Sequence, residues 1–148
     1  MKLLLIRHSL AEDFVNSDFE RHLTLRGKKR AERFFKIMKR IYPSINYIIS
    51  SAAFRAKETA EILAKFYNQK VIEENRLYQA NIEDFKEVLK DKKGIVAIVG
   101  HEPDLSEFIK YLTGIKNIKL SKPSLAEIED DTLKALFNYK CIKAIYER

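Results

Sequence analysis

Two histidines and two arginines in this sequence are of residue types that can bind and transfer a phosphoryl group. Arg7 and His8 are adjacent near the start of the chain, whereas Arg55 and His101 follow much later. A guanidinium is always charged, and its fork of N–H donors matches the oxygens of a phosphate. A neutral imidazole nitrogen is a nucleophile that can form a covalent intermediate. In a shared pocket, the arginines could hold a phosphoryl group while a histidine attacks it.

Each of these side chains follows a run of apolar residues. Buried strands are predicted for residues 2–6, 47–49 and 95–99, and one or more of the four side chains comes after each strand. In open α/β sheets, ligands bind beyond the carboxyl ends of the parallel strands. We therefore expect all four side chains to meet at one edge of one sheet.

Helix signals separate the predicted strands. Thr24 is a predicted N-cap for a first long helix, and Ser51 is a predicted N-cap for a second. A short helix is expected over residues 85–89, and another begins near Pro103 and ends at Gly114. Strands that alternate with helices in this way indicate an α/β fold with a largely parallel sheet.

The remaining segments give weaker signals. Strands are predicted near residues 71–72, 125–128 and 133–139, and the run 141–145 is interpreted as a strand or a tail. The expected architecture is a single-domain three-layer α/β sandwich, with helices on both faces of a mostly parallel sheet. We expect residues 1–148 to form this one domain.

Composition narrows the classes of protein and partner. With 148 residues, 46% of them hydrophobic, the chain can bury one sizeable core. The net charge of +7 favours anionic partners, but the basic residues form no stripe interleaved with aromatic residues, so no nucleic-acid partner is expected. No apolar run is long enough for a signal peptide or a membrane span, and Cys141 is the lone cysteine. We expect a cytoplasmic monomer without a membrane partner.

Several kinds of site are disfavoured by spacing. The four glycines form neither a G-x-G-x-x-G motif nor a P-loop, so no nucleotide cofactor is expected. A metallohydrolase built on His8, His101 and a carboxylate lacks a supporting H-x-x-x-H spacing. A non-catalytic phosphate-binding module remains an alternative. His22 is interpreted as structural, and the basic run 28–30 as a solvated helix face.

Four stretches, in order along the chain, resemble signatures of the histidine phosphatase superfamily, which has a phosphoglycerate-mutase-like fold. Ile6-Arg7-His8-Ser9 resembles its RHG signature, and residues 10–13 resemble the continuation in SixA-type phosphohistidine phosphatases. Residues 21–27 are similar to the RPLTxxG of that branch, residues 50–61 to its SSPxxRAxQTAE, and residues 99–106 to its VGHEPDLS. The matches cover about two thirds of the chain.

The resemblance implies a role for each of the four residues. His8 would be the phosphorylated nucleophile, Arg7 and Arg55 would bind the phosphoryl oxygens, and His101 would stabilise the transferring group from the opposite side. No metal or other cofactor is implied. The implied substrate is phosphohistidine on a signalling protein, such as a phosphotransfer domain, with small phosphate monoesters as the alternative.

The sequence departs from the signatures in three places. Ser9 stands in place of a glycine, which restricts the backbone next to the phosphate. His22 stands in place of a proline, and Ala52-Ala53 replace a proline-containing turn.

The resemblance leaves the proton donor for the leaving group open. The candidates are carboxylates near the second arginine or the second histidine, or on the loop after the first strand: Glu102, Asp13, Glu73, Glu74, Glu83 and Asp84.

Overall fold

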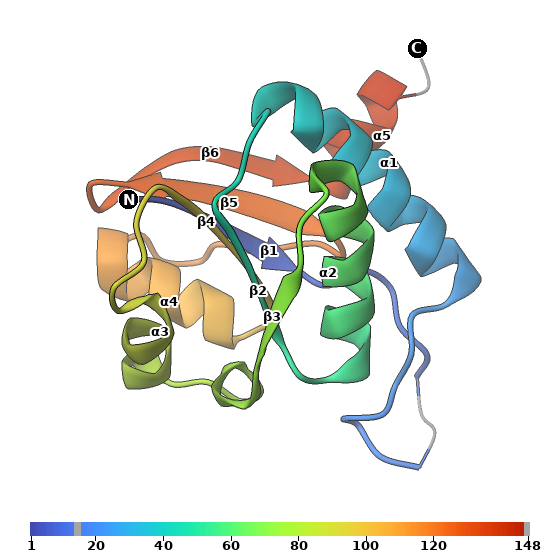
Figure 1. Cartoon of the computed structure of the whole chain (residues 1–148), viewed down its shortest axis with the longest axis horizontal. Helices are drawn as coiled ribbons and strands as arrows, with labels where there is room; N and C mark the ends of the chain where they lie inside the picture. The colour runs from blue at the N-terminus through green and yellow to red at the C-terminus, as the bar shows by residue number, and fades with distance from the viewer. Residues whose placement is uncertain (14–15, 147–148) are drawn as a thin grey trace.

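A six-stranded sheet forms the centre of the computed structural model, which describes residues 1–13 and 16–146. The strand order is β3-β2-β4-β1-β5-β6. The first four strands in this order are parallel, whereas β5 and β6 pair antiparallel with their neighbours. The predicted mostly parallel sheet is therefore confirmed (Figure 1). The strands are β1 (Lys2–Arg7), β2 (Tyr47–Ser51), β3 (Val71–Glu74), β4 (Ile95–Gly100), β5 (Ser124–Glu129) and β6 (Thr132–Asn138).

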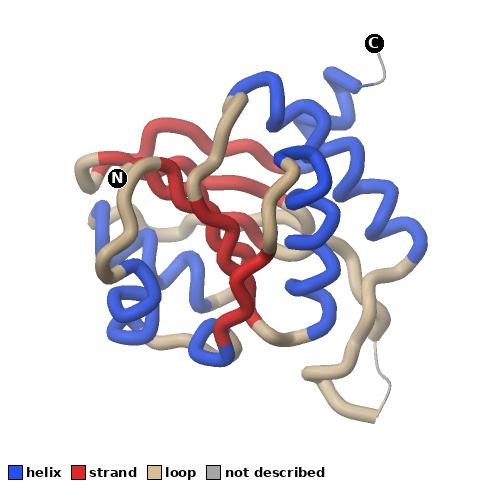
Figure 2. The backbone as a smooth tube through the Cα atoms, viewed as in Figure 1, coloured by secondary structure: helices blue, strands red, loops and turns tan. Residues whose placement is uncertain are grey.

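Helices cover both faces of this sheet, as Figures 1 and 2 show. Helices α1, α2 and α5 pack on one face, and α3 and α4 pack on the other with a short 3-10 turn, η1. The predicted three-layer sandwich is confirmed. The helical elements are α1 (Leu25–Ile41), α2 (Phe54–Tyr67), η1 (Asn75–Leu77), α3 (Ile82–Leu89), α4 (Asp104–Thr113) and α5 (Tyr139–Tyr146).

Alternate residues of the central strands supply the two halves of the core. In β1, Leu4 and Ile6 pack toward α1 and α2, whereas Leu3 and Leu5 pack toward α3 and α4. Successive side chains of a strand point to opposite faces of the sheet. Because both faces are covered, β1 and β4 are apolar at nearly every position, which is why their sequences are so easily identified as strands.

The two predicted helix caps have different outcomes. Thr24 caps α1, and its side-chain oxygen accepts a hydrogen bond from the Gly27 N–H at 2.9 Å. The prediction that Ser51 caps α2 is wrong, because pairing with β3 extends β2 to Ser51, opposite Glu74. Ala53 occupies the N-cap position of α2, with no side-chain cap.

The C-terminal run is a helix, so neither interpretation of residues 141–145 holds. Strand β6 ends at Asn138, and α5 begins at the next residue. Tyr139 and Ile142 lie about one helical turn apart, and both are buried in the same part of the core as α1. This burial, which depends on a distant helix, selects the helical conformation of a short apolar run.

The start of α1 is pressed against the loop after β1. A Cβ atom on Gly27 would lie 2.1 Å from the backbone oxygen of Leu10, so only glycine fits there. The same oxygen accepts a hydrogen bond from the Thr24 N–H at 3.1 Å. The close approach places the first turn of α1 beside the residues that follow β1.

Among the described residues, no helix has both the length and the hydrophobicity needed to cross a membrane.

Candidate active site

A pocket of about 440 Å³ lies at the carboxyl edge of the sheet, and all four predicted residues line it. Arg7 ends β1, His8 follows it, His101 follows β4, and Arg55 lies in the first turn of α2. Strands β1 and β4 are neighbours, and the His8 N–H donates to the Gly100 oxygen at 3.1 Å. The two imidazole rings are consequently only 5.3 Å apart between centroids. The full lining is Arg7, His8, Asp18, Arg21, Arg55, Tyr78, Gln79, His101, Glu102, Pro103, Asp104 and Lys122.

The His8 ring is held in one tautomer. Its Nδ1 lies 2.7 Å from the backbone oxygen of Ser9. A carbonyl oxygen can only accept, so Nδ1 carries the proton and Nε2 of the neutral ring has a free lone pair. Burial lowers the pKa of His8 well below its usual value, and the nearby His101, Arg55 and Arg7 lower it further. His8 is therefore a neutral imidazole with a nucleophilic Nε2 at neutral pH.

Ser9 is accommodated where the family signature has glycine. Its hydroxyl donates to the Gly27 oxygen at 2.7 Å, and its N–H donates to the Thr59 hydroxyl at 3.1 Å. Thr59 in turn donates to the backbone oxygen of Arg55 at 2.7 Å. The residue after His8 is thus tied to both α1 and α2, and the bonds link the His8 segment to the turn that carries Arg55.

The two arginines are anchored by different partners. Arg7 donates from NH1 to the Leu120 oxygen at 2.5 Å. Arg55 donates from NH1 to the backbone oxygen of Asp18 at 2.7 Å and from NH2 to the Asp18 carboxylate at 3.0 Å. In the described part of the chain, the buried Nε atoms of both arginines have no hydrogen-bond partner. Each guanidinium therefore retains N–H donors for an anion.

His101 is held by a serine hydroxyl. Its Nε2 lies 2.8 Å from the Ser51 oxygen, which also accepts from the Ala53 N–H at 3.3 Å. The Ser51 hydroxyl can donate its hydrogen to Nε2, and the ring proton of His101 then lies on Nδ1. This Nδ1 is buried and has no partner among the described residues. Burial, with Arg55 nearby, lowers the pKa of His101 to about 4, so it is neutral at pH 7.

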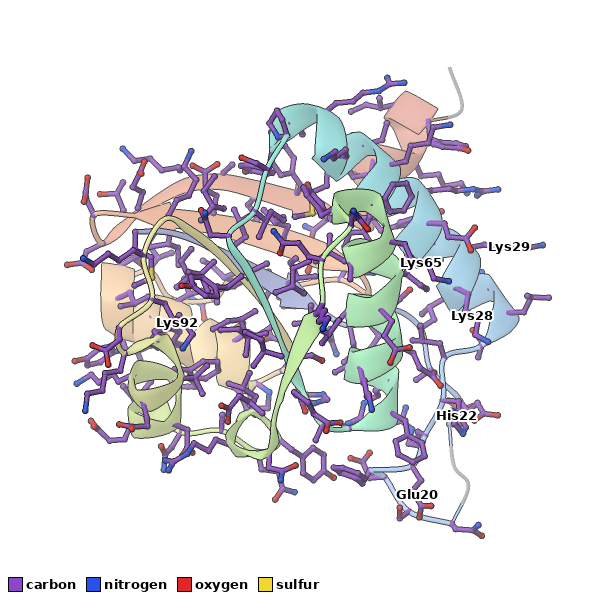
Figure 3. The ribbon with its side chains drawn as sticks, viewed as in Figure 1. Glu20, His22, Lys28, Lys29, Lys65 and Lys92 are labelled. Carbon is purple, nitrogen blue, oxygen red and sulfur yellow. The ribbon has the colours of Figure 1, made fainter. Side chains whose placement is uncertain are left out.

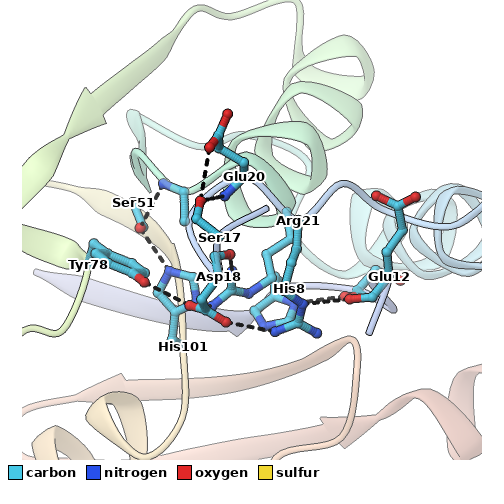
Figure 4. Close-up of polar contacts among 12 residues, drawn as sticks. His8, Glu12, Ser17, Asp18, Glu20, Arg21, Ser51, Tyr78 and His101 are labelled. Atoms are coloured by element: carbon cyan, nitrogen blue, oxygen red, sulfur yellow. Dashed lines mark hydrogen bonds and ion pairs between the residues drawn. The ribbon is translucent and has the colours of Figure 1, made fainter. Parts of the chain in front are cut away.

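The pocket also contains charged residues that the sequence analysis missed. Asp18 contacts Arg55 as described above, accepts from the Tyr78 hydroxyl at 2.7 Å, and forms an ion pair with Arg21 at 2.9 Å (Figure 4). The Lys122 side chain faces Arg7, Arg21 and Arg55, and its pKa is lowered by burial and by these cations. Asp18 lies between two stretches that resemble family signatures, but no local pattern points to Tyr78 or Lys122.

The other sequence interpretations can be compared with the structure. His22 is exposed, and its Nδ1 contacts Glu58 at 2.6 Å, outside the pocket lining. Lys28 and Lys29 are exposed on α1, where Figure 3 shows Lys29 extending outward, so the predicted solvated face is confirmed for these two. It is wrong for Arg30, whose guanidinium lies 4.5 Å from the centre of the Tyr139 ring.

Comparison with known proteins assigns the chain to a family. Residues 3–94 match the sequence profile of the histidine phosphatase superfamily (branch 1). The chain belongs to this superfamily. A phosphohistidine phosphatase SixA homologue of Haemophilus influenzae is 30% identical over 132 residues, covering 79% of this chain and 80% of the relative.

Solved structures of phosphatases share the fold. The protein histidine phosphatase SixA, complexed with tungstate, has a TM-score of 0.86 at 17% identity, covering 96% of this chain and 99% of its own. A mutant phosphoserine phosphatase from Entamoeba histolytica, in complex with phosphoserine, has a TM-score of 0.76 at 14% identity, covering 94% of this chain and 98% of its own. Neighbours of the same fold thus act on different phosphorylated groups.

Of the carboxylates predicted as proton donors, all of which the structure describes, one lines the pocket and the others do not. Glu102 lines it, but both oxygens of its carboxylate accept hydrogen bonds from Ser106, from the N–H at 2.8 Å and from the hydroxyl. The other candidates, Asp13, Glu73, Glu74, Glu83 and Asp84, are absent from the described lining. Asp104, which the sequence analysis did not consider, lines the pocket and has a pKa raised by burial.

A metal site would require several His, Cys, Asp or Glu side chains close together. Among residues 1–13 and 16–146, no group of three or more His, Cys, Asp or Glu side chains is placed to hold a metal ion.

Proposed function

We propose that this chain is a metal-independent phosphatase that hydrolyses phosphohistidine on a signalling protein through a phosphorylated His8. We also propose that residues 1–148 form one histidine phosphatase domain, acting as a cytoplasmic monomer. The observation that carries the proposal is the pairing of two neutral imidazoles, 5.3 Å apart, with two guanidiniums in one pocket. His8 offers a lone pair, and His101, Arg7 and Arg55 offer N–H donors.

The first step transfers the phosphoryl group to His8. The Nε2 lone pair attacks phosphorus while the bond from phosphorus to the substrate nitrogen breaks, and that nitrogen keeps the electron pair. Arg7 and Arg55 hold the phosphoryl oxygens, and the Nδ1–H of His101 donates to one of them. Donors that are already oriented stabilise the charge that builds up on these oxygens in the transition state.

The second step regenerates the enzyme. A water oxygen attacks the phosphorus of phospho-His8, the bond from phosphorus to Nε2 breaks, and Nε2 recovers its lone pair. Inorganic phosphate leaves as H2PO4⁻, with the oxygen and both hydrogens of the water. The Ser9 oxygen keeps the Nδ1 proton of His8 in place throughout, so the same nitrogen is the nucleophile in every cycle.

The low pKa of Asp18 supports a phosphohistidine substrate. A phosphorylated imidazole that is protonated on its other nitrogen leaves as a neutral ring, whereas an alkoxide leaving group needs a proton donor. Asp18 is a poor donor, because bonds from Tyr78, Arg21 and Arg55 hold its pKa well below the usual range. The name of the Haemophilus influenzae relative points to the same substrate.

Phosphate monoesters are the second candidate substrate. The raised pKa of Asp104 favours them, since a higher pKa increases the fraction of the carboxyl group that carries a proton to give to an alkoxide. The bound phosphoserine of the Entamoeba histolytica neighbour shows that the fold itself accommodates a monoester.

The test is to trap the phosphorylated enzyme and to compare substrates. The protein is mixed with a phosphotransfer domain that carries phosphohistidine, and the reaction is quenched rapidly at alkaline pH. Mass spectrometry then locates the acid-labile phosphate on the protein. We expect the label on His8, no turnover in His8→Ala, and unchanged activity with a chelator. Preference for phosphoserine or sugar phosphates would favour the monoester candidate. Phosphate binding without any turnover would indicate the binding module.

A further inference from the structure

We propose that Asp18 is a positioning residue that fixes the guanidinium of Arg55 in the orientation that receives the phosphoryl group. The inference rests on the proposed phosphatase function, because it takes Arg55 as a phosphoryl ligand. Asp18 lies on the loop between β1 and α1, and Arg55 lies in the first turn of α2.

Asp18 holds Arg55 at two points. Its backbone oxygen accepts from NH1 at 2.7 Å, and its carboxylate accepts from NH2 at 3.0 Å. Two bonds from one residue to the two terminal nitrogens define the plane and the rotation of the guanidinium. The remaining N–H groups of Arg55, including the buried Nε that has no partner in the described structure, are left for a phosphoryl group.

The same carboxylate links three segments of the chain. Besides Arg55, it accepts from the Tyr78 hydroxyl at 2.7 Å and from Arg21 NH1 at 2.9 Å. The Tyr78 ring lies edge-on to His101, with centroids 5.7 Å apart and planes at 82°. Asp18 therefore connects the arginine side of the pocket to the histidine side (Figure 4).

The loop that carries Asp18 is itself anchored. The Phe54 N–H donates to the Phe19 oxygen at 3.0 Å. The Phe19 ring packs against Phe54 and Tyr78, with centroid separations of 5.9 Å and 5.1 Å. The neighbour of Asp18 is thus fixed to the start of α2, so the carboxylate is held where it meets Arg55.

Burial explains why Arg55 needs this partner. Its side chain is only 7% exposed, whereas that of Asp18 is 52% exposed. A buried guanidinium without a counter-charge is costly, and a cation at the amino end of a helix also opposes the helix dipole. Asp18 offsets both costs, and it stays ionised because its three donors hold its pKa far below the usual value.

The positioning role and simple electrostatics predict opposite signs. A carboxylate that acted only through space would repel a phosphate anion, so its removal would tighten phosphate binding. A carboxylate that orients Arg55 helps the anion to bind, so its removal would weaken phosphate binding. The sign of the change therefore decides between the two roles.

The experiment measures inorganic phosphate binding by calorimetry in the full-length chain, its variants and a double mutant. We expect Asp18→Ala to weaken binding roughly tenfold and Asp18→Asn to weaken it less, because the amide keeps one acceptor oxygen. In an Arg55→Ala background, Asp18→Ala should cause little further loss. The matched control is Glu20→Gln, which removes a charge from the same loop, where the Glu20 carboxylate accepts a hydrogen bond from the Ser17 hydroxyl at 3.0 Å.

Unchanged or tighter binding in Asp18→Ala, or an equal loss in the Arg55→Ala background, would overturn the inference. If Asp18→Ala does not fold, as judged by circular dichroism, the nearly isosteric Asp18→Asn supplies the same comparison. Turnover is measured in parallel, and we expect kcat/KM to fall on the order of tenfold to a hundredfold. A parent protein that binds phosphate without turnover would refute the proposed function, while the binding data would still decide the role of Asp18.

Discussion

At the scale of single residues, the site depends on which ring nitrogen carries a proton. The Ser9 oxygen directs the His8 proton to Nδ1, and a hydrogen bond donated by the Ser51 hydroxyl to Nε2 would place the His101 proton on Nδ1 as well. In the proposed mechanism, the His8 ring attacks through Nε2, and the His101 ring donates through Nδ1. Two residues of the same type thus acquire different roles from the single hydrogen bond that each makes.

Ser51→Ala tests the tautomer of His101. Without the hydroxyl, the proton of His101 can occupy either nitrogen, so we expect kcat to fall roughly tenfold. Nitrogen-15 NMR of the labelled ring should show mixed tautomers. The matched control is Ser50→Ala, which removes a neighbouring buried hydroxyl. That hydroxyl donates to the backbone oxygen of Ser51 rather than to His101. A single Nδ1–H tautomer in Ser51→Ala would contradict this account.

The neutral His101 also makes stability depend on pH. Its pKa is about 4 in the folded state, below the ordinary histidine value of 6.5, so the unfolded chain binds a proton first as the pH falls. Stability is therefore retained above pH 6.5 and is lost between pH 6.5 and about 4. Between about pH 7 and about pH 5, the protonation linked to His101 should lower the free energy of unfolding by about 2 kcal/mol. Urea unfolding of the parent and of His101→Gln should differ by this pH-dependent amount.

At the scale of elements, each strand end or connection supplies a separate part of the pocket. The ends of β1 and β4 carry the histidines, and the start of α2 carries Arg55. The segment between α4 and β5 adds Lys122, and it is held by hydrogen bonds from Arg7 to the Leu120 oxygen and from Arg30 to the Lys122 oxygen. This anchoring places a further cation beside the arginines.

Lys122→Met tests that connection. Removing a cation that faces three arginines should weaken the attraction for phosphate, so we expect KM to rise roughly tenfold with a smaller change in kcat. Lys119→Met is the matched control, because Lys119 is exposed on the same segment and does not line the pocket. Equal effects of the two substitutions on KM would rule out a specific role for Lys122.

At the scale of the whole molecule, charge and fold act together. The chain has a net charge of +7, and four of its basic residues line the pocket: Arg7, Arg21, Arg55 and Lys122. A positive field of this kind steers anionic substrates toward the site and is screened by salt.

Steady-state rates over a range of salt should reveal this steering. Between about 0.05 and about 0.5 M NaCl, we expect kcat/KM for an acidic phosphoprotein to fall by an order of magnitude or so. A small phosphate ester, such as p-nitrophenyl phosphate, should show a weaker dependence, since it carries less charge. Rates for the phosphoprotein that did not change with salt would argue against steering.

Local patterns in the sequence determined the α/β class, the Thr24 cap and the strand ends that carry the two histidines and Arg7. They sufficed because strand and helix periodicity depend on neighbouring residues, and because β1 and β4 are buried on both faces. Only the tertiary structure decided the partners of Arg55 and His101, which are 37 and 50 residues away in the chain. It also decided that residues 141–145 are helical, through burial against a distant part of the core. These contacts join residues that are far apart in the chain, so they depend on the tertiary arrangement of the elements and are not encoded by a local pattern.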